Sequence, residues 1–278
     1  MGKTSKIEWC DATWNPIMGC TPISEGCANC YAKRHIARFA GINKGYPDRP
    51  DVVQCFTHRL EQPRGWKGRK RIFVCSLSDL FHEAVPAGFV YKIFWEMALC
   101  HQHTFLVLTK RPKRAIDLAC HMNAHKNICW GVSVENQARL EERWGAFCQF
   151  PSPRFLSLEP LLGPIYFDGL PTGSLIDWVI VGGESGSRAR PCNPDWVRSV
   201  RDQCRAMGTP FLFKQWGEWA PESQLPYYLG DTPSGQSYFP VKEAHGERFF
   251  RMGKHKAGRE LDGAEHLEFP RGLEGWPK

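Results

Sequence analysis

Short apolar runs recur along this chain and alternate with stretches of helical character, and this alternation constrains its fold more than any other feature. Uninterrupted apolar runs of this length are typical of parallel strands that are buried on both faces. Helix punctuation lies between them: Pro112 opens one helix, and Asn193 with Pro194 opens another that ends before Gly208. We predict an α/β fold, a partial (β/α)6-type TIM-like barrel. The predicted strands are 72–76, 105–109, 128–134, 155–158, 178–181 and 211–214, with a further short strand at 12–17 before a helix at 31–39.

Polar side chains collect where each predicted strand ends. Because active sites of parallel barrels form at the carboxyl ends of the strands, we expect these segments to converge on one pocket. The strand-end residues are Ser76, Ser78 and Asp79; Thr109, Lys110 and Arg111; Ser133, Glu135 and Asn136; Ser157 and Glu159; Gly182, Gly183 and Glu184; and Lys214 and Gln215.

The composition changes after Trp219 to glycine, proline, tyrosine and charge, without a clear periodicity. We therefore predict a barrel domain over 1–219 and an appended segment over 220–278, which either covers the pocket or holds a substrate. No run of 18 or more apolar residues occurs, and the N-terminus lacks an apolar signal core. These observations predict a cytoplasmic protein without membrane association.

Cysteine usage separates one loop from the rest of the chain. Cys20, Cys27 and Cys30 lie close together among glycines and prolines, whereas other cysteines are scattered singly through apolar segments. Thiolates are soft ligands for iron–sulfur clusters or zinc, and a C-x6-C-x2-C run leaves one iron of a four-iron cluster open. Structural zinc is the alternative, with Cys10 as a fourth ligand. The isolated cysteines Cys75, Cys100, Cys120, Cys129 and Cys204 are predicted to be buried small hydrophobes.

The formal net charge of +7 is compatible with a polyanionic partner. Two clusters place cations beside aromatic rings, which is typical of nucleic-acid contacts and also of solvated loops. The first cluster spans 58–71 and contains Arg59, Arg64, Lys67, Arg69, Lys70 and Arg71 around Trp66. The second spans 248–259 and contains Arg251, Lys254, Lys256 and Arg259 beside Phe249 and Phe250.

Six segments carry a family resemblance: WNPIMGCTPISEGCANCYA, VCSLSDLFHEAVP, LTKRPKR, WGVSVENQ, FLSLEPLLGPI and IVGGESGSRARP. In this order they resemble a phage-associated family that has a three-cysteine motif and is grouped with radical S-adenosylmethionine (SAM) enzymes. The usual loop of such enzymes is C-x3-C-x2-C with an aromatic residue before the last cysteine. Here six residues separate the first pair, and Asn29 takes the place of the aromatic residue.

The resemblance implies a radical SAM-like barrel in which Cys20, Cys27 and Cys30 bind three irons of a [4Fe-4S] cluster. SAM would chelate the fourth iron and, after reduction by an external electron donor, be cleaved to a radical that abstracts hydrogen from the substrate. The candidate substrate is a hypermodified thymine base in phage DNA, with isomerase or lyase chemistry in the host cytoplasm. Such a base must leave the stack to reach the site.

Under this resemblance, roles follow from strand position. Ser76, Ser78, Lys110 and Arg111 are assigned to the methionine end of SAM, Ser133 and Glu135 to its ribose hydroxyls or amino group, and Gly182, Gly183 and Glu184 to adenine. Asp79 and Glu159 are candidates for substrate binding or proton transfer, or else form charge pairs with Lys110, Arg111 or Lys214. Two other functions stay open: a zinc-stabilised nucleic-acid-binding protein without catalysis, and a metal-free hydrolase that uses Glu159 and Glu184.

Overall fold

A computed structural model of the chain describes residues 5, 7–119, 126–170, 176–225 and 240–272. The fold is mixed α/β, and seven strands follow the hydrogen-bonded order β1-β4-β5-β6-β7-β8-β9. The chain divides into two compact units, each described here by itself. Unit 1 comprises Met1–Ser133, Glu142–Phe155 and Arg271–Lys278, and unit 2 comprises Val134–Glu141 and Leu156–Pro270.

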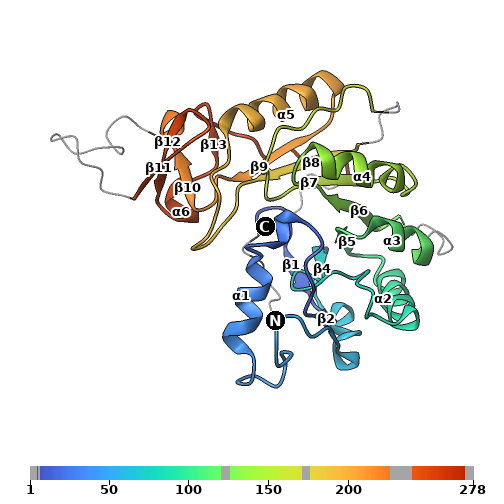
Figure 1. The fold of residues 1–278 in the computed structure, drawn as a ribbon. Coiled ribbons are helices and arrows are strands. Elements are labelled where there is room, and N and C mark those ends of the chain that lie inside the picture. The colour runs from blue at the N-terminus through green and yellow to red at the C-terminus, as the bar shows by residue number, and fades with distance from the viewer. Residues whose placement is uncertain (1–4, 6, 120–125, 171–175, 226–239, 273–278) are drawn as a thin grey trace. The chain divides into compact units, whose positions relative to one another are not determined.

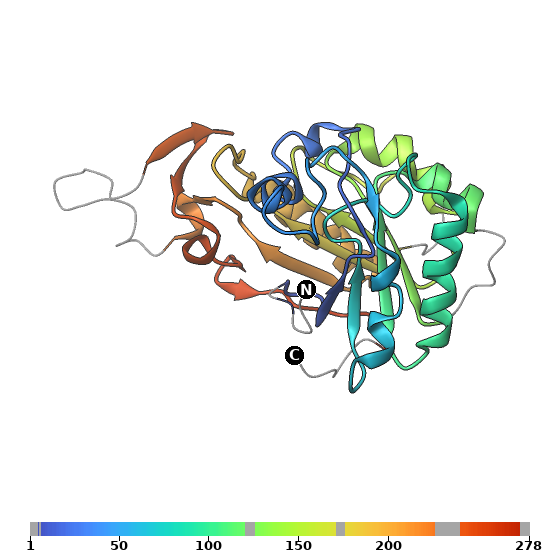
Figure 2. The same cartoon turned by 90° about the horizontal axis from the view of Figure 1, so that it is seen from below.

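Unit 1 is built on four parallel strands, with Ile72 of β4 paired to both Ala12 of β1 and Phe105 of β5. Figures 1 and 2 show α2 and α3 flanking β4 and β5. The strands are β1 (Ala12–Trp14), β4 (Arg71–Val74), β5 (Thr104–Thr109) and β6 (Ile128–Ser133), and a small antiparallel pair is formed by β2 (Ile17–Met18) and β3 (Gln54–Cys55). The helices are α1 (Tyr31–Phe39), α2 (Ala87–Leu99), α3 (Pro112–Ala119) and part of α4 (Gln137–Phe147), with short 3-10 helices η1 (Glu25–Cys27), η2 (Thr57–Arg59) and η3 (Gln62–Gly65).

Aromatic side chains form much of the core of unit 1. Trp130 on β6 stacks on Phe94 of α2 at 5.3 Å and on Phe150 at 5.1 Å between ring centroids. A Cβ atom at Gly131 would lie 2.3 Å from the ring of Phe155, so glycine at this position lets the ring lie against the strand. All six residues of β6 are buried, as expected for a strand covered on both faces.

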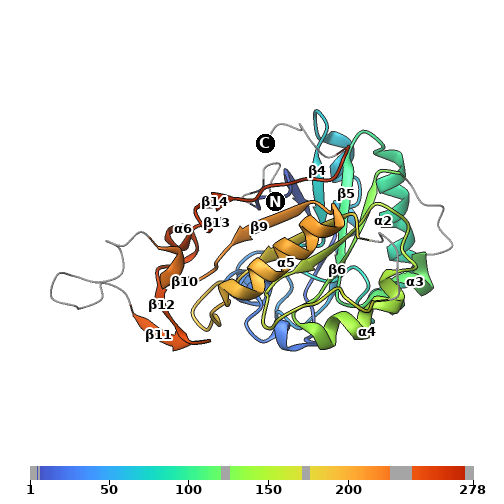
Figure 3. The same cartoon turned by 90° about the horizontal axis from the view of Figure 1, so that it is seen from above.

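Unit 2 contains the parallel pair β8 (Trp178–Gly182) and β9 (Phe211–Gln215), residues 156–158 of β7 (Arg154–Leu158), and α5 (Pro194–Met207), which lies alongside β9 in Figure 3. Asn193 caps α5 by accepting a hydrogen bond from the Asp195 amide, and Gly208 ends it in the left-handed conformation. A second sheet has the order β10-β12-β11, and a hairpin follows it. These elements are β10 (Trp219–Pro221), η4 (Glu222–Gln224), β11 (Val241–Ala244), β12 (Glu247–Arg251), α6 (Lys254–Ala257), β13 (Glu260–Leu261) and β14 (Ala264–Glu265).

The strand predictions are confirmed to within a residue or two, and the helix predicted over 31–39 is observed with those bounds. The predicted strand over 12–17 is instead divided between β1 and β2. The predicted sixfold alternation of strand and helix is not reproduced, because residues 159–170 and 176–177 between β7 and β8 contain no helix. Pro160 and Pro164 interrupt helical hydrogen bonding there.

The scattered cysteines Cys75, Cys100, Cys129 and Cys204 are buried, as predicted, whereas Cys120 lies outside the described residues. The segment 220–278, predicted without elements, carries short strands in its described part. Residues 226–239 and 273–278 of this segment lie outside that part.

Asp262 attaches the β13–β14 hairpin to α5. It occupies the turn with Gly263, and both residues have positive φ angles, as in a type I′ hairpin. Its carboxylate accepts hydrogen bonds from Arg198 at 2.7 Å and from Arg201 at 2.8 Å. The hydrogen bond from Arg198, followed by those from Arg201 and Gln224, holds the pKa of Asp262 below its usual range.

Because the folded pKa of Asp262 is depressed, its contribution to stability is present above about pH 4 and is lost as pH falls through the folded pKa. We expect Asp262→Asn to lower the thermal midpoint by a few °C at pH 7, and the difference from the wild type to shrink below pH 4. Differential scanning calorimetry across pH measures both. Asp195→Asn, which removes a more exposed partner of Arg198, is the matched control with a smaller expected effect. A difference independent of pH would contradict the ion-pair explanation.

Candidate functional site

The three-cysteine loop connects β2 with α1 in unit 1. Gly19 begins it with φ of +89°, and a Cβ atom there would lie 1.9 Å from the carbonyl oxygen of Val52, so only glycine fits. The Gly19 amide donates to the carbonyl oxygen of Leu77 at 3.2 Å, and the Cys20 amide donates to that of Pro50 at 3.0 Å. The backbone thus fixes the first cysteine beside the segment that follows β4.

The three thiols of this loop are free. Cys20 and Cys30 are half-buried, while Cys27 is buried at the end of η1. Cys30 precedes α1, and its amide donates to the Cys27 carbonyl oxygen at 3.4 Å. Burial, reinforced by the charges of Asp79 and Cys27, raises the pKa of the Cys20 thiol to about 12.

The donor set of the loop fits an iron–sulfur cluster. Three thiolates leave one iron of a [4Fe-4S] cluster without a protein ligand, as the spacing predicted. A single zinc ion needs its donors about 2 Å away. Within the described residues no group of three or more His, Cys, Asp or Glu side chains is arranged so that it could hold a metal ion, and this finding does not separate zinc from a cluster. The fit therefore rests on donor type and on the nearness of the three thiols along the loop.

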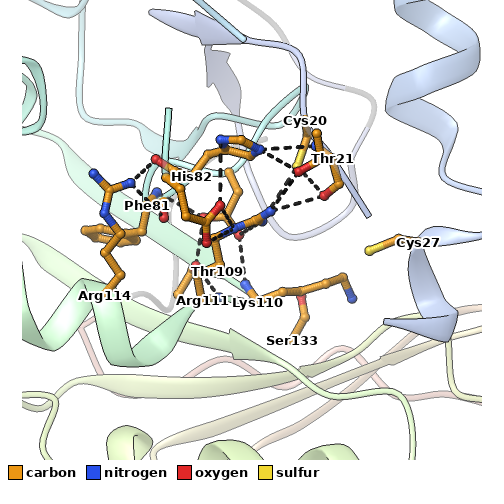
Figure 4. A network of polar contacts seen from close by, with 12 residues as sticks. Cys20, Thr21, Cys27, Phe81, His82, Thr109, Lys110, Arg111, Arg114 and Ser133 are labelled. Atoms are coloured by element: carbon orange, nitrogen blue, oxygen red, sulfur yellow. Dashed lines mark hydrogen bonds and ion pairs between the residues drawn. The ribbon is translucent and has the colours of Figure 1, made fainter. Parts of the chain in front are cut away.

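Arg111 connects this loop to the residues that follow β4 and β5 (Figure 4). Its Nη1 donates to the Cys20 sulfur at 3.7 Å and to an Asp79 oxygen at 3.3 Å. Nη2 donates to the carbonyl oxygen of Thr21 at 3.1 Å, and Nε contacts Glu83 at 2.9 Å. Since each nitrogen of the guanidinium already has partners, Arg111 serves the loop rather than offering a vacant site for a SAM carboxylate.

Asp79 is saturated with hydrogen bonds. It accepts from the Thr109 hydroxyl at 2.7 Å, the Lys110 amide at 3.0 Å and the Phe81 amide at 3.0 Å, besides Arg111. A carboxylate offers about four acceptor positions, so these contacts use them. The charge pair that the sequence left open is thus formed, and the geometry favours a positioning role for Asp79 over proton transfer.

Ser76 and Ser78 follow β4 and also hold backbone in place. The Ser76 hydroxyl lies 3.1 Å from the Asn15 amide nitrogen, and Asn15 accepts a hydrogen bond from the Leu77 amide at 2.9 Å. The Ser78 hydroxyl donates to the carbonyl oxygen of Ile17 at 2.9 Å. These contacts join the predicted serines to the end of β1 and to β2.

Ser133 ends β6 in unit 1, and Glu135 follows in unit 2; both are buried. The Ser133 carbonyl oxygen accepts a hydrogen bond from Arg143 at 2.6 Å, and that of Glu135 accepts one from the Leu162 amide at 2.8 Å. Both residues thus lie at the end of a buried strand, as predicted.

In unit 2, Glu159 lies at the end of β7 and forms an ion pair with Lys214 of β9, whose Nζ is 2.8 Å from Oε2. Its other oxygen, Oε1, is buried without a hydrogen-bond partner in the described structure. A Cβ atom at Gly182 would lie 3.3 Å from Glu159 Cγ. The absent side chain at Gly182 therefore leaves room for the Glu159 carboxyl group, one oxygen of which is buried without a partner in the described structure.

The remaining strand-end residues of unit 2 are engaged with protein atoms. Glu184 accepts hydrogen bonds from the Arg190 side chain at 2.6 and 2.9 Å and from its backbone amide at 2.9 Å. A Cβ atom at Gly183 would lie 1.8 Å from the Trp216 carbonyl oxygen. The close backbone approach predicted for a flat ligand is thus made by the chain itself.

The basic clusters bury their rings and expose only some of their cations: Arg59 and Arg71 are buried, and Arg71 pairs with Asp11 at 2.9 Å. Trp66 is 9% exposed, so its ring is not presented to a base, and Arg64 pairs with Glu96 at 2.6 Å. Lys67 and Arg69 are exposed, and Lys70 is half-buried. In the second cluster Phe249 and Phe250 are buried, Arg251 contacts Glu218 at 3.1 Å, Lys254 is half-buried and Lys256 is exposed.

Sequence reasoning missed several residues that support the cysteine loop. His82 lies 2.7 Å from the Thr21 hydroxyl, and the Tyr31 hydroxyl donates to the Ser76 carbonyl oxygen at 2.6 Å. Burial lowers the pKa of His82, which favours its neutral form. The only available signal was its place in the segment SLSDLFHEAVP, which carried the family resemblance without a role for His82.

Comparison with known proteins identifies a family. The model of a family described as "Protein of unknown function (DUF5131)" matches residues 4–270. No curated protein matches the chain. Spore photoproduct lyase complexed with dinucleoside spore photoproduct is similar to it at 8% sequence identity and a TM-score of 0.45, over 88% of this chain and 68% of the lyase. A point mutant of spore photoproduct lyase gives 8% identity and a TM-score of 0.44, over 93% and 75%.

None of the helices in the described part of the chain has both the length and the apolar character needed to cross a membrane.

Proposed function

We propose that this chain, which belongs to the DUF5131 family, is a radical SAM enzyme whose [4Fe-4S] cluster is held by Cys20, Cys27 and Cys30. The observation that carries the proposal is the set of three free thiols in one short loop, beside polar side chains from the ends of β4 and β5. Three thiolates suit a cluster with one open iron. When bound, the cluster and SAM supply one-electron cleavage of SAM and abstraction of a hydrogen atom from the substrate.

The residues of the chain then bind and orient the cofactors and the substrate, and they exclude water from the site. The backbone bonds of Gly19 and Cys20 and the side chain of Arg111 fix the first cysteine, and Cys27 is itself buried. We assign the binding of SAM to Lys110 and Ser133 at the ends of β5 and β6, where the sequence first suggested it. Glu159, with one oxygen fixed by Lys214, stays a candidate for substrate binding or proton transfer.

The substrate we propose is a nucleotide in DNA, with a hypermodified thymine as the leading candidate and isomerase or lyase chemistry. Its support is the family resemblance together with the exposed cations Lys67 and Arg69, which follow η3. Cations on such a segment neutralise phosphates without reading sequence. Because Trp66 is buried, this surface would bind the DNA backbone and would not stack on bases.

The test is formation of 5′-deoxyadenosine by the anaerobically reconstituted, reduced protein with SAM. We expect turnover to rise on addition of DNA that contains the modified base and to stay at background with unmodified DNA. Lys67→Glu combined with Arg69→Glu should weaken DNA binding several-fold and reduce its dependence on salt, because two phosphate contacts are lost. Absence of 5′-deoxyadenosine under all conditions would contradict the proposed activity, while formation that ignores DNA would contradict only the substrate.

The two other functions are less well supported by the site. Glu159 and Glu184 are each held by a cation, Lys214 and Arg190 respectively. Both carboxylates are thus engaged in ion pairs, whereas a hydrolytic acid and base must be positioned towards a substrate. Zinc remains distinguishable by metal analysis.

A further inference from the structure

Arg111 is a buried cation at the point where β5 gives way to α3. Its side chain is only 5% exposed. A charged group at this depth is stable only when it is paired and hydrogen-bonded. The hydrogen-bond partners of Arg111 therefore show which segments of the chain it connects.

Two kinds of partner meet at this guanidinium (Figure 4). On one side are the sulfur of Cys20 at 3.7 Å and the carbonyl oxygen of Thr21 at 3.1 Å, both in the cysteine loop. On the other are the carboxylates of Asp79 at 3.3 Å and Glu83 at 2.9 Å. Arg111 is thus a bridge between the first thiol and an acidic pair.

The acidic side of this bridge is rigid. Asp79 is fixed by the Thr109 hydroxyl at 2.7 Å and by the Phe81 amide at 3.0 Å, and the Thr109 hydroxyl also accepts from the Arg111 amide at 2.8 Å. Thr21 is fixed from the other side by His82. The direction in which Arg111 presents its N–H groups to the Cys20 sulfur is therefore set by the surrounding structure.

Hydrogen bonds to the sulfur ligands and nearby charge are two of the factors that set the reduction potential of an iron–sulfur cluster. A positive N–H donor stabilises the additional negative charge of the reduced state. We propose that Arg111 is a positioning residue that holds Cys20 in place as a cluster ligand and raises the reduction potential of the cluster. This inference rests on the proposed function and adds to it a residue that controls electron entry.

The planar guanidinium is needed for this positioning role, because its N–H groups contact Cys20, Thr21 and the two carboxylates at the same time. A lysine keeps the charge but supplies a single nitrogen, so it can replace only part of the arrangement. Arg111→Gln removes the charge and leaves the carboxylates of Asp79 and Glu83 without this cation. Both changes lower the potential, and the glutamine variant should lower it more.

The experiment is a redox titration of the reconstituted full-length protein in the absence of SAM, followed by the electron paramagnetic resonance signal of the reduced cluster. We expect the midpoint to become more negative in Arg111→Gln and to return partly towards the wild type in Arg111→Lys. Arg114→Gln, three residues further along in α3, is the matched control. Arg114 donates to the carbonyl oxygens of His82 and Val85 and has no contact with a cysteine of the loop, so its midpoint should equal that of the wild type.

Glu83→Gln keeps the experiment decisive if Arg111→Gln does not fold. The Glu83 side chain is 65% exposed, so its replacement leaves the core intact, and it removes a negative charge from the guanidinium. Its midpoint should shift in the positive direction. Read together with Arg111→Lys, which keeps the positive charge, this shift shows whether the midpoint follows the charge of this network, which a purely structural role of Arg111 does not predict.

The outcomes separate the inference from the function on which it rests. Folded Arg111→Gln that loses iron, or binds it at a more negative potential, supports the inference. If the midpoint of Arg111→Gln equals that of the wild type, the inference is overturned and the proposed function is left intact. Where Arg111→Gln does not fold, the same conclusion follows if the midpoints of both Arg111→Lys and Glu83→Gln equal that of the wild type. Wild-type protein that takes up no cluster overturns the function and the inference together.

Discussion

Replacing Cys27 with alanine is expected to abolish retention of iron and sulfide while leaving the chain folded. Cys27 is the central member of the trio, and a cluster with only two protein thiolates loses a ligand as well as its open-site geometry. Truncation of this buried side chain costs about 1 kcal/mol in stability, which a chain of this size tolerates. Iron and sulfide analysis after anaerobic reconstitution gives the result, and circular dichroism monitors the fold.

Cys148→Ala is the control for this experiment. Cys148 is also free, and it is half-buried, but it follows α4 and has no place in the proposed metal centre. We expect it to retain iron at the wild-type level. Equal iron content in the Cys27 and Cys148 variants would remove the three-cysteine loop as the cluster site.

The second large effect is expected from Gly183→Ala. A Cβ atom at this position would lie 1.8 Å from the carbonyl oxygen of Trp216 and 2.6 Å from its carbonyl carbon, so backbone must move to accommodate it. Such overpacking costs about 3 kcal/mol, which lowers the thermal midpoint by roughly 6–12 °C. Calorimetry of the metal-free protein measures this change without any contribution from a cofactor.

Gly182→Ala is the neighbouring comparison. Its Cβ atom would lie 3.3 Å from Glu159 Cγ, a side chain that can shift by a few tenths of an ångström. We expect a loss of less than about 1 kcal/mol. If the two substitutions prove equally costly, the close backbone contact between Gly183 and Trp216 is not the reason for glycine at that position.

The parallel strands were predictable because they are covered on both faces. Such strands read as continuous apolar runs, as in residues 128–133, all of which are buried. Helix α5 was equally visible, since Asn193, Pro194 and Gly208 mark its ends and behave as expected. These features depend on local sequence alone.

The elements after Trp219 were missed for a physical reason. They are strands of two to five residues in antiparallel pairs, and several of their residues are exposed, so neither burial nor alternation is strong. The pair Asp262–Gly263 was the signal that could have been used, because such a dipeptide favours a two-residue hairpin.

For the candidate site, the sequence indicated which residues end the strands but not their partners. Asp79, Arg111 and Glu184 were identified by position, and the structure shows that each is engaged with protein groups. A charge pair between distant residues leaves no local pattern, so the contact of Arg111 with Cys20 could not be predicted. Asn15 and His82 were missed because an isolated polar residue predicts no particular partner.

The metal content of the anaerobically purified and reconstituted chain tests the central claim most directly. The account predicts brown protein with iron and acid-labile sulfide at [4Fe-4S] stoichiometry, bound through Cys20, Cys27 and Cys30, and a reduced-state electron paramagnetic resonance signal that SAM perturbs. Colourless protein that holds zinc and no sulfide at these cysteines would contradict it.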